Sequence, residues 1–130
     1  MLSDPIADLL TRIRNAYAVK IKTVKAPYSQ FKENLVKIMI DNNYLKSFKI
    51  IGKPPHRHLE LILKYPGLKP AVETLTRISK PGVRVYAGTK DVSRLRKGRG
   101  ITIISTPSGL MTLKDAKKKN IGGEIICKIS

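Results

Sequence analysis

The sequence predicts an α+β protein made of two small α/β lobes, and three observations support this. The chain has 130 residues, 42% of them hydrophobic, which is enough for one compact core or two small ones. Amphipathic helical spacing alternates with strand-like runs before residue 66, whereas the remainder is rich in strands. Pro66, Gly67 and Pro70 punctuate the chain between these parts. We therefore expect domains over residues 1–66 and 67–130.

Two amphipathic helices are expected in the first lobe. Asp4-Pro5 favours a helix start, and the helix should run to about Tyr17. Its apolar face is formed by Ile6, Leu9, Leu10, Ile13 and Tyr17. Ser29 should cap the second helix, which ends near residues 41–43. Its apolar stripe is formed by Phe31, Leu35, Ile38 and Met39.

Strands should supply the surface on which these helices pack. A short strand is expected over residues 22–26, between the helices. Two more are expected over residues 44–51 and 59–65, joined by a turn at Gly52-Lys53-Pro54-Pro55. The first lobe therefore reads helix, strand, helix, strand, strand.

The second lobe should begin with extended chain. Residues 72–79 precede a break at Pro81-Gly82 and a strand over residues 83–86. Period-two alternation would place Val83 and Val85 on one face of this strand and Arg84 and Tyr86 on the other. We therefore expect Tyr86 to point away from the core.

The rest of the second lobe contains one short helix between strands. Residues 91–97 are compatible with a single helical turn, and residues 101–106 with a central strand. Thr112 should cap a helix that reaches about Lys119, with Asp115 placed as in a capping box. Gly122-Gly123 should end that helix and open a final strand over residues 124–129.

The charge balance indicates the class of partner. The chain has 26 Lys and Arg against 9 Asp and Glu, a formal net charge of +17. Residues 1–70 and residues 71–130 each carry 13 of the cationic residues, so there is no basic tail. A polyanion would neutralise this excess and gain entropy from counterion release. Nucleic acid is therefore the predicted partner. A membrane surface is disfavoured, because no segment concentrates the charge on one amphipathic helix beside bulky apolar anchors.

The single cysteine, Cys127, excludes an internal disulfide and suits a reducing compartment. Its neighbours Ile125 and Ile129 favour a core position for the thiol. The first residues lack a basic segment followed by a long apolar run, and no stretch approaches the length of a membrane span. We therefore expect a soluble protein without a targeting segment.

Hydroxyl groups gather at the end of the predicted central strand. Ser105, Thr106 and Ser108 lie beside Pro107, which stiffens the path, and Gly109, which permits close approach. Such hydroxyls suit the 2′-hydroxyls and base edges of RNA, although they can equally cap backbone groups in a strand-to-helix connection. Lys114 and Lys117 would flank a phosphate at the start of the following helix.

This segment also resembles a known family, the bacterial-type small-subunit ribosomal protein eight. The family signature is a glycine, a short apolar strand, Ser-Thr, a second glycine, two apolar residues and a small residue with a basic neighbour. Its elements here are Gly100, Ile103-Ile104, Ser105-Thr106, Gly109, Leu110-Met111 and Ala116-Lys117. Residues 3–16 and Gly122-Gly123-Glu124 are similar to the two ends of the family, so the resemblance covers the whole chain.

The resemblance implies a set of RNA contacts. In the second lobe these are Ser105, Thr106, Pro107, Ser108 and Gly109, with Tyr86 and the corner Gly122, Gly123 and Glu124 nearby. Arg84 lies on the outward face with Tyr86 and joins this predicted site. In the first lobe the implied contacts are Asp4, Ser29 and Lys32.

The resemblance also implies partners. It predicts a structural constituent of the small ribosomal subunit that binds the central domain of 16S ribosomal RNA and helps its assembly beside other small-subunit proteins. The alternative is a translational repressor that binds a ribosomal-protein messenger RNA, including that of its own operon, through the same surface. We expect a monomer outside the ribosome, located in the cytoplasm, although an organelle that synthesises its own ribosomal proteins fits equally.

Other candidate sites are disfavoured. His56-Arg57-His58 offers two imidazoles without nearby Cys or acidic ligands, so a solvated turn is favoured over a metal site. Gly98-Arg99-Gly100 lacks the third glycine of a dinucleotide-binding loop. The scattered acids offer no paired carboxylates or activated nucleophile. The sequence therefore predicts no enzyme, metal or cofactor, and leaves Tyr86 either as an RNA contact or as cover for an interface.

Overall fold

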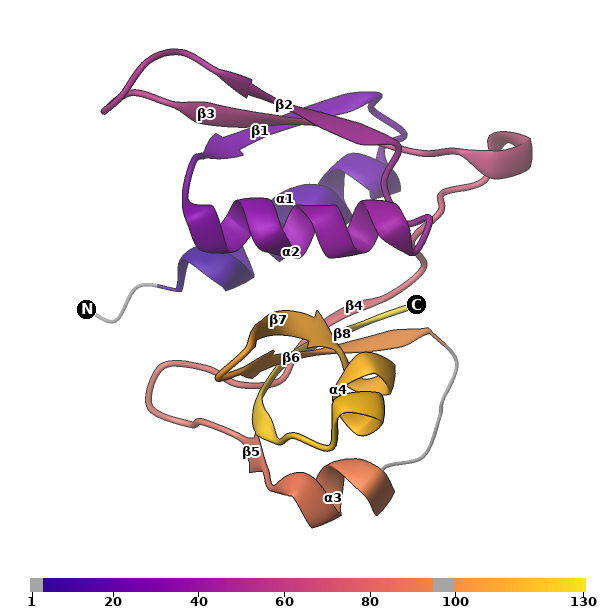
Figure 1. Cartoon of the computed structure of the whole chain (residues 1–130). Helices are drawn as coiled ribbons and strands as arrows, with labels where there is room; N and C mark the ends of the chain where they lie inside the picture. The colour runs from indigo at the N-terminus through magenta and orange to yellow at the C-terminus, as the bar shows by residue number, and fades with distance from the viewer. Residues whose placement is uncertain (1–3, 95–99) are drawn as a thin grey trace. The chain divides into compact units, whose positions relative to one another are not determined.

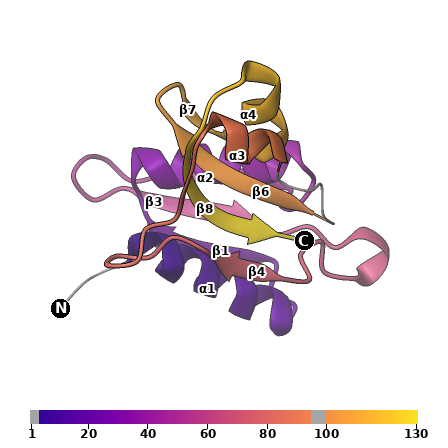
Figure 2. The ribbon, with the colours of Figure 1, turned by 90° about the horizontal axis from the view of Figure 1, so that it is seen from below.

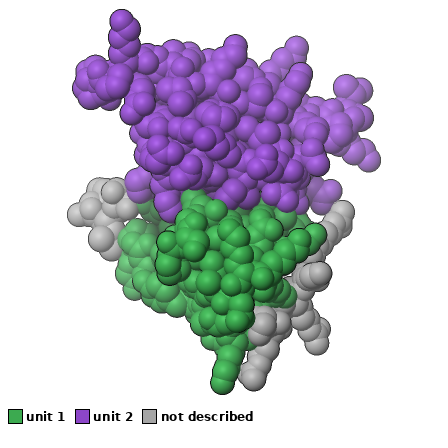
Figure 3. All heavy atoms as spheres, in the orientation of Figure 1, with its two compact units in different colours: residues 1–4, 74–130 green, residues 5–73 purple. Residues whose placement is uncertain are grey.

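The computed structural model describes residues 4–94 and 100–130 and confirms the predicted α+β class (Figure 1). The chain forms two compact units, shown in different colours in Figure 3. One unit is Pro5–Glu73, and the other is Thr74–Ser130 together with Asp4. The units therefore divide between Glu73 and Thr74, whereas a domain boundary between residues 66 and 67 stays a prediction.

The first unit has the predicted order of helices and strands. Its elements are α1 (Pro5–Ala18), β1 (Thr23–Pro27), α2 (Gln30–Asp41), β2 (Ser47–Ile51), β3 (His58–Ile62) and the 3-10 turn η1 (Pro66–Leu68). The strands form an antiparallel sheet in the order β1-β3-β2, and α1 and α2 cover one face of it (Figure 1). β2 begins three residues later than predicted, at Ser47, because residues 42–44 turn, and β3 ends three residues earlier than predicted, at Ile62.

The core of this unit is built from the predicted helical faces. α1 buries Leu9, Leu10, Ile13, Ala16 and Tyr17, and α2 buries Leu35, Val36 and Met39. Each such apolar side chain contributes about 1.5–3 kcal/mol when it leaves water. The Tyr17 hydroxyl donates to the Tyr44 carbonyl and accepts from the Lys64 amide at 3.1 Å, so it fixes the end of α1 against chain segments far away in sequence.

The second unit is a five-stranded antiparallel sheet with two short helices. Its elements are β4 (Leu75–Arg77), β5 (Tyr86–Ala87), α3 (Thr89–Arg94), β6 (Ile101–Thr106), β7 (Gly109–Thr112), α4 (Leu113–Lys119) and β8 (Gly123–Ile129). The order is β4-β8-β6-β7, and β5 also pairs with β8. Figure 2 shows β8 running between β4 and β6. The α3 and α4 helices pack on one face of the sheet through an apolar cluster of Ala87, Val92, Ile104, Met111, Leu113 and Ala116.

Two helix caps and the core cysteine agree with the sequence. Ser29 Oγ accepts from the Lys32 amide at 3.2 Å, and Thr112 Oγ1 accepts from the Asp115 amide at 3.3 Å. Cys127 is fully buried, and burial raises the pKa of its thiol to about 12. Thr112 thus ends β7 and caps α4 without an intervening loop.

The predicted strand over residues 83–86 is wrong in extent. Only Tyr86 and Ala87 form register pairs with β8, although the Val85 carbonyl accepts from the Ile125 amide of that strand at 2.9 Å. Val83 is exposed instead of facing the core. Lys80 and Val83 exchange backbone hydrogen bonds around Pro81-Gly82, because Gly82 adopts a φ of 85° that closes a tight turn. Tyr86 points outward as predicted, with 70% of its surface exposed.

Two further expectations differ from the structure. The connection after Thr106 is a two-residue turn into β7, so the central strand opens a hairpin before the last helix begins. The helical turn expected over residues 91–97 begins earlier, as α3 at Thr89. Residues 95–97, and Gly98-Arg99 of the glycine motif, lie outside the described residues.

Candidate nucleic-acid interface

Four strands bring the predicted RNA contacts into one row across the second sheet. Tyr86 on β5 is the register partner of Glu124 on β8, Glu124 is also the partner of Ser105 on β6, and Ser105 is that of Leu110 on β7. Register partners point to the same face of a sheet. With strands about 4.8 Å apart, this row spans roughly 15 Å. We call Tyr86, Glu124, Ser105 and Leu110 the cross-strand row.

The row lies on the sheet face opposite α3 and α4. The chain neighbours of its members, Ala87, Ile104 and Met111, belong to the apolar cluster under those helices, and side chains alternate between faces. Within the residues described, the second unit therefore keeps its own helices off the Tyr86 face. Apolar packing on one side thus fixes the polar and aromatic side chains on the other.

Thr106 has a structural role in the turn beside the row. Its hydroxyl donates to the Gly109 carbonyl at 2.8 Å and accepts from the Ser108 amide at 3.1 Å. The side chain is 9% exposed. For Thr106, the hydroxyl is therefore used to close the turn, and any contact with RNA would come from the turn that it shapes.

The two serines beside Thr106 keep their hydroxyls available. Ser105 is half-buried and Ser108 is exposed, and neither hydroxyl bonds to any residue of the described chain. Gly109 has a φ of 107°, and a Cβ there would meet nothing within 4 Å. The turn therefore presents free hydroxyls next to open space, as contact with a polar ligand requires.

Gly122 and Gly123 are explained by the close approach of neighbouring strands. A Cβ on Gly122 would lie 2.3 Å from the Ala87 carbonyl oxygen, and one on Gly123 would lie 2.0 Å from that of Ser105. Neither position accommodates a side chain without moving backbone. These glycines hold β5, β6 and β8 together at the point where the cross-strand row is formed.

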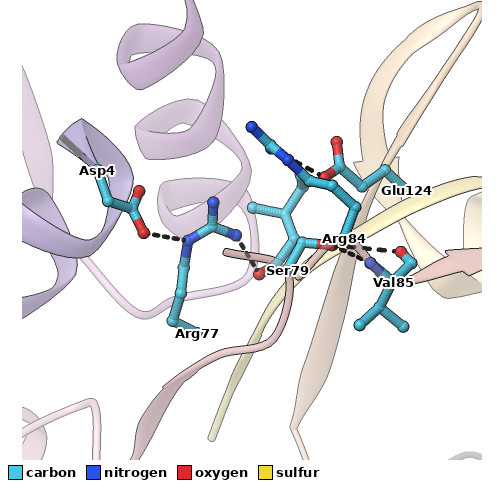
Figure 4. A network of polar contacts seen from close by, with 7 residues as sticks. Asp4, Arg77, Ser79, Arg84, Val85 and Glu124 are labelled. Atoms are coloured by element: carbon cyan, nitrogen blue, oxygen red, sulfur yellow. Dashed lines mark hydrogen bonds and ion pairs between the residues drawn. The ribbon is translucent and has the colours of Figure 1, made fainter. Parts of the chain in front are cut away.

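The outward position of Arg84 and Tyr86 depends on a buried serine, Ser79. Its hydroxyl donates to the Val85 carbonyl at 3.2 Å and accepts from the Val85 amide at 2.8 Å, as Figure 4 shows. Ser79 is completely buried. It thereby closes the loop over residues 80–84 and directs Arg84 toward Glu124, whose Oε2 accepts from Arg84 Nη1 at 3.1 Å.

Sequence reasoning missed Ser79 and its neighbour Arg77. Arg77 Nε pairs with Asp4 Oδ2 at 3.2 Å and Arg77 Nη1 donates to the Ile126 carbonyl at 2.7 Å (Figure 4). The partners lie 73 and 49 residues away in the chain. No local pattern reports such pairs, so only the fold reveals that Arg77 joins β4 to Asp4 and β8 and that Ser79 closes the loop that carries Arg84.

Not every predicted contact joins the cross-strand row. Lys114 is exposed and Lys117 half-buried on α4, which packs against the opposite face of the sheet through Leu113 and Ala116. Arg84, Tyr86, Ser105, Glu124 and the turn at Pro107-Ser108 come together, whereas the α4 lysines lie away from their face. All of these remain predictions as RNA contacts.

The predicted contacts of the first lobe each have a partner within the protein. Asp4, which the structure groups with the second unit and not the first, pairs with Arg77, and Ser29 caps α2. Lys32 is buried, and its Nζ donates to the Pro27 carbonyl at 3.1 Å. Burial lowers the pKa of the Lys32 ammonium, an effect that Asp8 opposes and Arg12 strengthens. Their proposed roles toward RNA are therefore additional to structural ones.

The described part of the chain contains neither a group of metal-binding side chains nor a helix that could span a membrane. Among residues 4–94 and 100–130, no group of three or more His, Cys, Asp and Glu gathers as a metal would need, and this includes His56 and His58. None of the helices in the same part of the chain combines the length and apolar character needed to cross a bilayer.

Comparisons with a family profile and with individual proteins point to the same family. The sequence profile of the family described as ribosomal protein S8 matches residues 4–130. The small ribosomal subunit protein uS8 of Thiobacillus denitrificans is 43% identical, with 99% of this chain and 98% of the relative aligned. The uS8 proteins of Dictyoglomus turgidum and Thermus aquaticus are 41% and 42% identical, and the alignments span 98% and 99% of this chain and 98% and 99% of the respective relatives.

Proposed function

The chain belongs to the ribosomal protein S8 family, and from this premise we propose that it is a constituent of the small ribosomal subunit that binds the central domain of 16S ribosomal RNA directly. It would help that domain to assemble, beside other proteins of the subunit. The observation that supports this most is the cross-strand row with its adjoining turn. It presents an aromatic ring, free hydroxyls and a paired Arg–Glu on one face of a +17 protein.

Two kinds of interaction would contribute to RNA binding. Lys and Arg residues would bind phosphates without regard to sequence, and that contribution weakens steeply as salt rises. The row would add recognition of an irregular RNA helix, because Tyr86 can stack on a splayed base and Ser105 can bond to a base edge or a 2′-hydroxyl. Specificity is thus assigned to few residues and affinity to many.

Glu124 fits this face despite its negative charge. Its Oε2 is bonded to Arg84, which neutralises the carboxylate, and Oε1 has no hydrogen-bond partner within the described chain. A carboxylate oxygen accepts from base amino or imino groups and repels phosphates. Glu124 would therefore favour a base edge at the centre of the row over the RNA backbone.

Substitutions in the row test this function. Ser105→Ala should weaken binding to a central-domain stem about three- to tenfold, the value of one hydrogen bond, and Tyr86→Leu about tenfold or more through lost stacking. Binding to a regular duplex of equal length should barely change. Fluorescence titrations of both RNAs provide the measurement.

The matched control is Ser47→Ala, which removes an exposed serine hydroxyl from β2 of the other unit. It should leave both affinities at the wild-type level. Equal losses on both RNAs for Ser105→Ala would remove the row from the recognition mechanism. A messenger RNA stem that reproduced the same irregular helix would compete for this face, which is how the alternative repressor function would operate.

A further inference from the structure

An arginine of the first unit has its guanidinium carbon over a tyrosine ring. Arg57 follows the turn between β2 and β3, and its Cζ lies 4.1 Å from the centroid of the Tyr28 ring, within the range of a cation–π contact. The Tyr28 amide also donates to the Arg57 carbonyl at 3.1 Å. Backbone and side chain thus both join the β2–β3 hairpin to the connection between β1 and α2.

The tyrosine ring is held in place from its other end. Its hydroxyl donates to Glu33 Oε1 at 2.7 Å, and Glu33 Oε2 pairs with Lys37 Nζ at 2.8 Å. The hydrogen bonds from Lys37 and then from Tyr28 lower the pKa of the Glu33 carboxyl. Lys37 therefore compensates most of the charge of the carboxylate that anchors the ring. The charge of Arg57 lowers the pKa of Glu33 by less, and the two side chains form no ion pair within the described chain.

Within residues 4–94 and 100–130, no acceptor bonds to the guanidinium donors of Arg57. Arg12, Arg77 and Arg84 each pair with a carboxylate. Within the described chain, by contrast, Arg57 makes its ring contact without donating to any acceptor and without an ion pair. A planar group with five N–H donors, fixed on one side and idle on the others, is suited to an external anion.

The surrounding hairpin is cationic and well defined. Residues 47–62, which form β2, the turn and β3, contain three Lys or Arg, two His and one acid, Glu60. Gly52 has a φ of 88°, and a Cβ there would lie 2.5 Å from the His56 carbonyl oxygen, so the hairpin closes tightly at this residue. The His56 amide donates to the Lys53 carbonyl at 2.8 Å. Arg57 is consequently presented in a fixed place within a local positive field.

We propose that Arg57, held on the Tyr28 ring, binds a backbone phosphate of RNA and forms a second contact site in the first unit. The inference rests on the proposed function, because ribosomal RNA is the polyanion concerned. A guanidinium fork matches two phosphate oxygens, and orientation on a ring reduces the freedom lost on binding. In this proposal the solvated turn favoured from the sequence at His56-Arg57-His58 is an ordered phosphate site, supported by Tyr28, which precedes Ser29 in the chain.

Three substitutions separate this role from simple charge. Arg57→Ala removes both charge and fork, Arg57→Lys retains the charge but loses the planar fork, and Lys53→Ala removes one charge from the same hairpin. We expect Arg57→Ala to weaken binding to the central-domain stem about tenfold or more and Arg57→Lys several-fold. Lys53→Ala should weaken it only about twofold, as an unoriented surface charge.

The salt dependence identifies the contact as a phosphate. Arg57→Ala should reduce the slope of log affinity against log salt by about one, whereas Arg57→Lys should keep the slope of the wild type. Thermal unfolding of each variant reports whether it folds. If Arg57→Ala does not fold, the test rests on Arg57→Lys, which retains the charge and the aliphatic stem.

The outcomes separate the two claims. If the wild type prefers the stem to a regular duplex but Arg57→Lys matches the wild type and Arg57→Ala matches Lys53→Ala, the second site is wrong and the proposed function stands. If the wild type shows no preference, the proposed function fails, and the slopes still decide whether Arg57 contacts phosphate. A larger effect of Arg57→Ala on binding of a polyglutamate peptide than on RNA would instead assign the site to an acidic protein.

Discussion

Adjacent hydroxyls in the turn after β6 have different roles. Thr106→Val keeps the shape of the side chain but leaves the Ser108 amide and the Gly109 carbonyl without their partner, so it should lower the free energy of unfolding by about 1–2 kcal/mol. Ser105→Ala breaks no hydrogen bond in the described chain and should change stability by less than about 0.5 kcal/mol. Urea denaturation measures both, and equal losses would contradict the assignment.

The buried thiol of Cys127 predicts a pH dependence of stability. Burial raises the thiol pKa from 9.0 to about 12, so the folded protein keeps its proton where the unfolded chain loses it. The contribution of this thiol to the free energy of unfolding is fully present below pH 9 and is lost as the pH rises toward 12. Between pH 9 and pH 10, the wild type should lose about 1 kcal/mol more than Cys127→Ala, measured by urea denaturation at each pH. Parallel losses in the two proteins would show that the thiol does not contribute.

Single residues were predictable where a local pattern fixes them. The core position of Cys127, the caps Ser29 and Thr112 and the outward Tyr86 follow from periodicity and short-range hydrogen bonding. Lys32 was not predictable as a buried residue, because its ammonium is stabilised by the Pro27 carbonyl, which only the fold brings within reach. The same limit applies to the Arg57–Tyr28 contact, whose members lie on different elements.

At the scale of elements, the spacing between strands should control the stability of the second sheet. Gly123→Ala would place a Cβ 2.0 Å from the Ser105 carbonyl oxygen and force β6 and β8 apart, at a cost of about 3 kcal/mol or more. Gly109→Ala is the matched control, since its Cβ has free space and only the φ of 107° is strained, at about 1 kcal/mol. Chemical denaturation distinguishes these values, and a cost for Gly109→Ala as large as that for Gly123→Ala would contradict the close-approach explanation.

The loop between β4 and β5 should lose its order without Ser79. Ser79→Ala leaves the Val85 amide and carbonyl without their side-chain partner, and should cost about 1–3 kcal/mol of stability. Because the loop positions Arg84 and Tyr86, binding to the central-domain stem should also weaken several-fold, whereas binding to a regular duplex should not. Unfolding curves and RNA titrations of the same preparation measure both effects. Full RNA affinity in a destabilised Ser79→Ala variant would show that the loop does not depend on this serine.

Most elements were predictable because apolar periodicity sets them. The exceptions are short strands, which depend on partners more than on their own sequence. β7 has four residues and follows a two-residue turn, so its sequence reads equally as a connection to α4. Residues 83–85 alternate like a strand, but Val83 bonds to Lys80 across the turn at Gly82 and the Val85 amide bonds to Ser79. The Val85 carbonyl is shared between the Ser79 hydroxyl and the Ile125 amide of β8.

At the scale of the whole molecule, the proposed function assigns general affinity for RNA to the net charge and specific recognition of RNA to the fold. The net charge of +17 is spread over both units and supplies affinity for any polyanion, while the cross-strand row and Arg57 are local. Composition was sufficient to predict the class of partner, and the resemblance at residues 100–117 was sufficient to predict the family. Neither predicts which side chains form hydrogen bonds within the protein. The Thr106 hydroxyl forms two such bonds and the Ser105 hydroxyl forms none in the described chain, a difference that only the structure shows.

The measurement that tests the central claim most directly is a competition for the wild-type protein between a central-domain stem of 16S ribosomal RNA and a regular duplex of equal length. At about 200 mM salt, counterion release alone gives weak binding, so a preference reports specific recognition. The account predicts a preference of about 10³-fold or more for the stem. Equal binding of the two RNAs would contradict it and would show that the protein binds RNA through its positive charge alone.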